Sequence, residues 1–201
     1  IENTGGDSSQ HAMLRELELD QDAHERLLAH CGNRGIEFLS TPFDEQSLAF
    51  LDRGLEVARI KLGSGELTNA PLLLAAGRTG KPVILSTGMA TMDDMRRAID
   101  TCHDHGNDQV ALLQCTSLYP APAALSNLAA MSAMAEAFDV VVGYSDHTNG
   151  DHVSLAAVAR GACIIEKHFT LDRSLPGPDH KFAIEPDELA TMMMRLRDVE
   201  A

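Results

Sequence analysis

The chain has 201 residues, of which 44% are hydrophobic and 23% charged, a balance typical of a soluble globular domain with a sizeable core. Its formal net charge of −14 argues against a nucleic-acid partner, and no apolar run reaches the roughly 20 residues that a membrane span needs. The first ten residues do not resemble a signal peptide and the four cysteines form no CxxC pair, so we expect reduced thiols in a cytoplasmic protein.

The chain begins with a polar stretch that contains glycine and serine, so we expect a loose segment over residues 1–19 and one domain over residues 20–201. Short apolar runs in this domain alternate with segments of helical periodicity. The expected strands are 36–39, 58–62, 83–85, 110–113, 140–142 and 163–165. Helices are expected from residue 20, over 43–51, after Asn69, after Thr91, around 128–138, over 153–159 and after Pro186.

Regular alternation of strands and helices predicts a parallel sheet, either open and doubly wound or closed as a (β/α)₈ barrel. No GxGxxG opens a helix, which gives the dinucleotide-binding alternative little support. Polar residues and glycines follow every expected strand, as they do at the mouth of a barrel. We therefore expect an α/β fold of the TIM (β/α)₈ type, with six of the eight strands present.

Two apolar runs near the end of the chain each lead into a histidine, His147 and His168. Side chains alternate between the two faces of a strand, so Ser145 shares a face with His147 and Glu166 shares a face with His168. A single histidine at a strand end is more often structural. Two on consecutive parallel strands, with a carboxylate beside them, favour a site for a divalent metal ion, in which Glu166 acts as a base or supports a ligand.

Hydroxyl side chains follow several of the expected strands, and Lys61 lies at the end of one of them. Taken alone, Lys61 could be a solvated lysine at a strand end, but the neighbouring glycines would let backbone N–H groups approach an anion. A cation and a ring of hydroxyl donors together predict a site for a phosphate or carboxylate group. The hydroxyl residues are Ser64, Ser86, Thr116, Ser117 and Ser145.

Two further acidic residues lie in loops after expected strands. Glu66 closes the glycine-containing loop after Lys61 and could be solvated or could contact a substrate. Asp179 lies in a proline-rich loop over residues 176–180, which could be a structural turn or a place for sugar hydroxyls to bind.

Five ordered motifs resemble the N-acetylneuraminate (sialic acid) synthase family over residues 36–196. They are IKLGSGELTNAPLL, GKPVILSTGMAT, LLQCTSLYPAP, VGYSDHT and IIEKHFTLDRSLPGPDHKFAIEPDEL. The resemblance implies a (β/α)₈ barrel that condenses phosphoenolpyruvate with an N-acyl amino sugar such as N-acetylmannosamine and releases phosphate. It also implies a divalent cofactor, Mn²⁺ or Mg²⁺, and a homodimer in the full-length protein.

The resemblance also assigns roles to individual residues. It implies that His147 and His168 bind the metal ion. It implies that phosphate is bound by Lys61, Ser64, Ser86, Ser117 and Ser145, and that the sugar is contacted by Glu66, Tyr119 and Asp179. Glu166 matches the carboxylate beside the metal, and we take Glu166 and Glu66 as the candidate catalytic carboxylates.

Compared with the family pattern, the sequence matches strands three to eight of the barrel, without the first two strands or the C-terminal antifreeze-like domain. We therefore expect this stretch alone to be weakly active or inactive. Three alternatives remain at this point: a legionaminic or pseudaminic acid synthase, a catalytically incomplete barrel that acts as a binding module, and a metal hydrolase on a TIM barrel.

Overall fold

The computed structural model describes residues 15–201, and its centre is a five-stranded parallel sheet in the order β1-β2-β3-β4-β5. Residues 1–14, which include most of the segment expected to be loose, lie outside the described part. Each strand pairs with the next strand along the chain. The strands are β1 (Ile60–Leu62), β2 (Val83–Ser86), β3 (Val110–Cys115), β4 (Val141–Asp146) and β5 (Ile165–Lys167).

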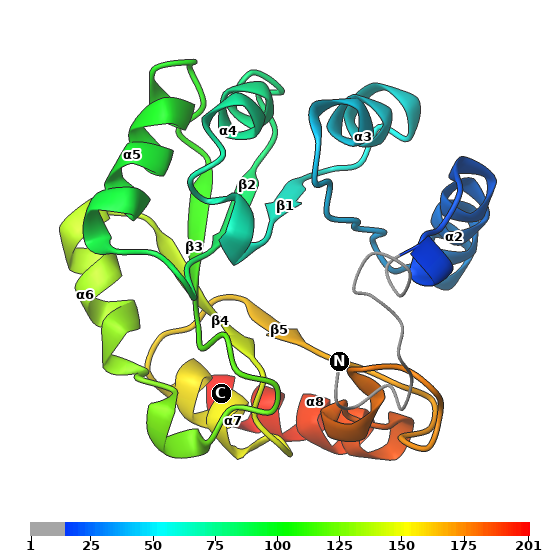
Figure 1. Cartoon of the computed structure of the whole chain (residues 1–201). Helices are drawn as coiled ribbons and strands as arrows, with labels where there is room; N and C mark the ends of the chain where they lie inside the picture. The colour runs from blue at the N-terminus through cyan, green and yellow to red at the C-terminus, as the bar shows by residue number, and fades with distance from the viewer. Residues whose placement is uncertain (1–14) are drawn as a thin grey trace.

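Helices connect the strands and cover the outer face of the sheet, which curls into an open arc (Figure 1). The α-helices are α2 (Gln21–Arg34), α3 (Glu45–Ala49), α4 (Ala70–Gly77), α5 (Met92–His103), α6 (Ala129–Phe138), α7 (His152–Ala159) and α8 (Pro186–Glu200). One π-helical turn, η1 (Phe50–Gly54), and three 3₁₀ turns, η2 (Ser64–Glu66), η3 (Ala123–Leu125) and η4 (His180–Phe182), complete the set. The fold is α/β with the curled parallel sheet of a partial TIM-type barrel, as the sequence predicted.

Side-chain caps fix where the expected helices begin. Asn69 accepts a hydrogen bond from the backbone of Leu72 and so starts α4, with a proline in the first turn. Thr91 starts α5 through a capping box with Asp94, in which each side chain accepts from the other residue's backbone N–H. Because both helices start just past a strand, the caps also set the length of the loops that carry the candidate site residues.

The two faces of the sheet carry different side chains. The face toward the helices forms the main hydrophobic core, which includes Ile60, Leu62, Leu85, Leu112 and Tyr144. The alternate positions point into the lumen of the arc, where Ile84, Ala111 and Leu113 form a second, smaller cluster with Ile164. Since strands alternate their side chains, the position after each core residue is the one available to the lumen.

The expected strand over residues 36–39 is wrong: these residues have no regular secondary structure and pair with no strand in the described part. Ile36 is 62% exposed, and the segment reaches β1 through side chains rather than through a backbone ladder. Arg59, just before β1, forms an exposed ion pair with Glu37 at 2.6 Å. The sheet therefore has five strands where the apolar pattern predicted six, because an apolar run becomes a strand only where a neighbour accepts its backbone hydrogen bonds.

Two expectations from composition can be compared with the structure. Among residues 15–201, no helix is long and apolar enough to cross a membrane. All four cysteines lie in the described part, and each is a free thiol. Cys102 and Cys115 are buried, whereas Cys163 is exposed.

Candidate active site

The candidate residues gather where the strands end at their carboxyl side. On β1 the buried Lys61 lies between two core residues, so its side chain points to the opposite face, into the lumen. Ser86 ends β2 and is also buried. In barrels of this type the carboxyl ends of the strands form the mouth in which reactions take place.

A contact across the lumen joins the first and the last strand of the sheet. Lys61 Nζ lies 3.4 Å from Glu166 Oε2 on β5, and it also donates hydrogen bonds to Ser86 Oγ at 2.8 Å and to the Leu62 carbonyl at 3.1 Å. β1 and β5 are at opposite ends of the sheet order, so only the curl of the sheet brings these side chains together. The Lys61 side chain is 7% exposed, which strengthens its attraction for an anion.

Glu166 extends this chain of contacts to the first histidine. Ser145 Oγ donates to Glu166 Oε1 at 2.7 Å, and the same oxygen lies 3.5 Å from His147 Nε2. Ser145 and Glu166 are direct partners in the β4–β5 register. The contact between Ser145 and His147 confirms the predicted sharing of a face by these two residues, and the register places Glu166 beside Ser145.

The two histidines lie side by side, with ring centroids 5.4 Å apart. His147 Nδ1 lies 2.8 Å from the Thr116 carbonyl oxygen, which can only accept, so Nδ1 carries a proton and Nε2 points away from that carbonyl. His168 Nδ1 lies 3.5 Å from Asp179 Oδ2, which favours the same arrangement of its ring. Burial lowers the pKa of His168 below its ordinary value and the His147 ring adds to this, although the Asp179 carboxylate opposes it.

Neutral imidazoles with one nitrogen held by an oxygen are the form in which histidine binds a metal ion. Within residues 15–201, no group of three or more His, Cys, Asp or Glu side chains is arranged to hold a metal. An ion bound between His147 and His168 would therefore take its other ligands from oxygen atoms of water or substrate. The two rings fit an ion such as Mn²⁺, which accepts both imidazole and oxygen ligands.

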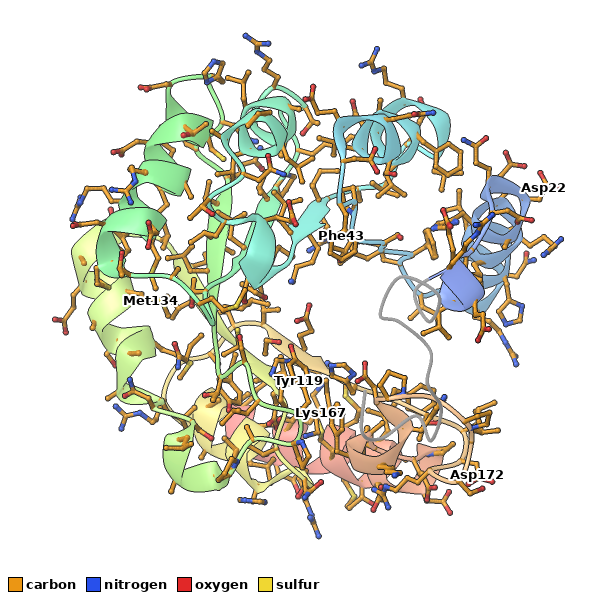
Figure 2. The ribbon with its side chains drawn as sticks, in the orientation of Figure 1. Asp22, Phe43, Tyr119, Met134, Lys167 and Asp172 are labelled. Carbon is orange, nitrogen blue, oxygen red and sulfur yellow. The ribbon has the colours of Figure 1, made fainter. Side chains whose placement is uncertain are left out.

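Aromatic side chains enclose the histidines. The Tyr119 ring lies 4.2 Å from the His147 ring and 5.8 Å from the His168 ring, and Phe182 lies 4.9 Å from His168. Figure 2 shows Tyr119 on the inner side of the arc, near the end of β5. Burial raises the pKa of Tyr119, with further contributions from Cys115, Asp179 and Glu166, so the phenol stays protonated and can donate a hydrogen bond. We call Tyr119, His147, His168 and Asp179 the histidine cluster.

A second group of polar atoms lies after β1, β2 and β3. Ser64 Oγ accepts a hydrogen bond from the Gly88 backbone N–H at 2.9 Å and lies 3.3 Å from Cys115 Sγ. The Ser117 hydroxyl packs against the same glycine. We call Ser64, Gly88, Cys115 and Ser117 the hydroxyl cluster. The sequence predicted its two serines, but it gave no reason to single out Gly88 or Cys115.

Glu66 is the predicted site residue that the contacts do not join to the others. Its Oε2 accepts a hydrogen bond from the Asn69 side chain at 2.7 Å, and Asn69 in turn caps α4. Within the described part of the chain, the bond from Asn69 is the hydrogen bond that involves the Glu66 side chain. The local geometry thus gives Glu66 a structural partner, and its role toward a substrate stays a prediction.

The sequence also missed a buried ion pair behind the histidines. Lys167 Nζ lies 3.0 Å from Asp146 Oδ2, and the two side chains are 5% and 0% exposed. Asp146 also accepts hydrogen bonds from Thr148 and from Ser154 of α7, and Lys167 donates to the Thr148 carbonyl. The alternation of faces could have revealed this pair, because Asp146 and Lys167 directly precede the two histidines and must face the helices.

A hollow at the other end of the lumen has a different lining. It measures about 570 Å³ and is lined mainly by apolar side chains at the amino ends of the strands, including Val83, Val110 and Ile164. Arg59, His103 and Asp108 stand at its border. In barrels of this type the active site lies at the carboxyl ends of the strands. The polar side chains described above converge at that end, away from this hollow.

Comparison with known proteins shows the family to which the chain belongs. The NeuB family model matches residues 1–201. The N,N'-diacetyllegionaminic acid synthases of Campylobacter jejuni and Legionella pneumophila are 46% and 47% identical to the chain. They match over 100% and 98% of its length. The human N-acetylneuraminate-9-phosphate synthase is 37% identical over 92% of the chain. The chain spans 60%, 56% and 52% of the lengths of these three relatives.

Solved structures show the same fold. The N-acetylneuraminic acid synthetase of Leptospira borgpetersenii superimposes with a TM-score of 0.90 at 33% identity, over 96% of this chain and 68% of that one. The spore coat polysaccharide biosynthesis protein SpsE of Bacillus subtilis gives a TM-score of 0.86 at 36% identity, over 99% and 57%. The sequence match over the whole chain and these structural similarities show that the chain belongs to the NeuB family.

Proposed function

We propose that the chain carries the barrel part of the active site of a nonulosonic acid synthase, which condenses phosphoenolpyruvate with an N-acyl amino sugar and releases phosphate. The observation that carries the proposal is the continuous path from Lys61 through Glu166 and Ser145 to His147. It links the buried Lys61 to the pair of imidazoles. An anionic substrate and a metal-assisted electrophile can therefore be held next to each other.

The anion half of the proposal rests on local charge. The chain as a whole is acidic, but Lys61 is a buried cation with a hydroxyl, Ser86, at hydrogen-bond distance. In a site from which water is largely excluded, one cation with several hydroxyl donors binds a phosphate group well. Ser64, Ser117 and Ser145 would supply the further donors.

The reaction requires a bond between C3 of phosphoenolpyruvate and the aldehyde carbon of the sugar, followed by addition of water at C2 and loss of phosphate. A Mn²⁺ or Mg²⁺ ion held by His147 and His168 would supply Lewis acidity at the aldehyde. Glu166, fixed by Ser145 and Lys61, would accept a proton from the water that adds at C2. Lys61 would stabilise the departing phosphate, and Tyr119 and Asp179 would orient the sugar.

The relatives are named as synthases of different sugar acids, and their identities to the chain indicate which sugar substrate to test first. Legionaminic acid synthases share 46–47% identity with the chain, N-acetylneuraminate-9-phosphate synthases 37–41%, and a pseudaminic acid synthase 34%. The predicted N-acetylneuraminate-type product and the legionaminic alternative both remain within the proposal. The higher identities support testing a diacetamido sugar first, with N-acetylmannosamine beside it.

The proposal is tested by two measurements on the full-length protein, because the 201-residue stretch alone is expected to be weakly active or inactive. Calorimetry should show binding of phosphoenolpyruvate, and a phosphate-release assay with Mn²⁺ and a panel of N-acyl sugars should show turnover that one sugar supports best. Removal of the metal with EDTA should stop phosphate release, and added Mn²⁺ should restore it. Failure to bind phosphoenolpyruvate would contradict the proposal, whereas binding without turnover for any sugar would favour the binding-module alternative.

Two further expectations belong to the same proposal. A homodimer is expected for the full-length protein, and sedimentation velocity measures it directly. A cytoplasmic location is expected from the separated cysteines, and fractionation of cells that express the full-length protein tests it.

A further inference from the structure

Gly88 lies at the centre of the hydroxyl cluster, and the space where a side chain would start is already filled. A Cβ atom built on Gly88 would lie 2.5 Å from Ser117 Oγ, 2.7 Å from Cys115 Sγ and 3.1 Å from Ser64 Oγ. Ser64 follows β1, Cys115 is the last residue of β3 and Ser117 lies just after it, whereas Gly88 follows β2. One missing methyl group thus lets three separate strand ends converge.

The need for glycine here is one of space. The backbone of Gly88 does not have the positive φ that would itself demand glycine. Gly65, one residue after Ser64, differs: its added Cβ would meet only Met89 Cε, at 3.8 Å, which is an ordinary contact. The crowding at Gly88 is therefore not shared by the glycine of the neighbouring loop.

The crowding atoms are the ends of short side chains. An alanine at position 88 could be accommodated if Ser117, Cys115 and Ser64 rotate to other staggered positions, while the backbone stays in place. Such a rotation would turn the two serine hydroxyls away from the positions that they now occupy. The fold would survive the substitution, but the arrangement of donors would not.

We infer that Gly88 is a positioning residue of the anion site: it keeps the hydroxyls of Ser64 and Ser117 together, with the Cys115 thiol, so that they bind the phosphate oxygens of the substrate. This inference rests on the proposed function, which assigns the two serines to phosphate. Gly88 acts through its neighbours' side chains. The ligand class is a tetrahedral oxyanion, either as inorganic phosphate or as a phosphate ester.

The test is the Gly88→Ala variant, with Gly32→Ala as the control, and isothermal titration with phosphoenolpyruvate and with inorganic phosphate. We expect Gly88→Ala to bind both anions roughly tenfold or more weakly, because hydrogen bonds to a charged group are lost. Gly32 lies in α2, where an added Cβ would have no atom within 4 Å, and we expect Gly32→Ala to bind both anions like the wild type. Circular dichroism should show that both variants are folded.

A double substitution separates positioning from a general loss of stability. Ser117→Ala should weaken anion binding in the wild type but change little in the Gly88→Ala background, where the hydroxyl is already displaced. Should Gly88→Ala fail to fold, the Gly88→Ala/Cys115→Ala variant, in which the thiol no longer crowds the methyl, carries the same comparison.

The outcomes distinguish the inferred role of Gly88 from the proposed function of the chain. If Gly88→Ala binds phosphoenolpyruvate like the wild type, or if Ser117→Ala has its full effect in both backgrounds, the inference about Gly88 is wrong and the proposed function stands. If the wild type binds neither anion, the anion site itself is wrong, and the proposed function is overturned together with the inference.

Discussion

The histidine cluster and the hydroxyl cluster face the same lumen, but they are held in place in different ways. The histidines follow β4 and β5, and behind them lies the buried Asp146–Lys167 ion pair. The hydroxyl cluster is held by close packing around Gly88 and by a backbone hydrogen bond to Ser64. Electrostatics thus orders one half of the site and steric fit orders the other, so the two halves should respond to different substitutions.

The largest expected effect is the loss of metal binding when a histidine is removed. His147→Ala and His168→Ala should each abolish Mn²⁺ binding, because each removes one of the only two protein ligands that are proposed. Electron paramagnetic resonance of Mn²⁺ measures this without turnover. The exposed His103 is the control, and its replacement by alanine should change nothing. Undiminished Mn²⁺ binding in either variant would remove the metal assignment, while retained phosphoenolpyruvate binding would show that the two halves are separable.

The next effect is on stability and concerns the ion pair behind the histidines. Lys167→Met should lower the free energy of unfolding by about 3–5 kcal/mol, because it leaves the Asp146 carboxylate buried without its charge partner. Urea denaturation measures the change. The exposed Arg59–Glu37 pair is the matched control, and Arg59→Met should lower stability by less than about 1 kcal/mol. Equal effects of the two substitutions would show that burial does not set the importance of the pair.

A third prediction addresses the charge in the anion half. Lys61→Met should weaken phosphoenolpyruvate binding by about 2–5 kcal/mol, a factor of ~30 or more, because a buried cation that faces the anion is lost. Lys81, which pairs with Asp52 outside the site, serves as the control. Calorimetry at constant ionic strength decides the point, and an unchanged dissociation constant for Lys61→Met would place the anion elsewhere.

The smallest expected effect has the opposite sign. Glu166 contacts Lys61 across the lumen, so an incoming anion must compete with its carboxylate. Glu166→Gln removes the competing charge and should tighten inorganic phosphate binding, by no more than about 1 kcal/mol or roughly fivefold, because the Glu166 side chain is 43% exposed. Phosphate release should fall in the same variant if Glu166 accepts the proton. Weaker phosphate binding in this variant would show that the main effect of Glu166 is to hold Lys61 in place, and that its competition with phosphate for Lys61 is the smaller effect.

The sequence predicted the parts of the molecule that depend on local pattern. The caps at Asn69 and Thr91 and the face-sharing of Ser145 with His147 follow from short-range rules, and the structure agrees with them. The fold class followed from the alternation of strands and helices. The strand over residues 36–39 did not form, because its apolar pattern says nothing about whether a neighbour pairs with it.

What the sequence could not predict depends on contacts between distant strands. The Lys61–Glu166 contact spans the whole sheet and exists only because the sheet curls. Gly88 gave no signal because a glycine after a strand is common, and its crowding is visible only once three loops are placed together. Glu66 followed the site pattern in sequence, yet its side chain is turned to Asn69.

The strict alternation along β4 and β5 has a consequence for how this site can change. Ser145, His147 and Glu166 face the lumen, while Asp146 and Lys167 between and beside them face the helices. Insertion of a single residue in either strand would exchange these sets, placing the ion pair in the mouth and the imidazole or carboxylate in the core. Such a site can be altered by substitution but not by small insertions or deletions, so the lengths of these two strands are as much a part of the chemistry as their side chains.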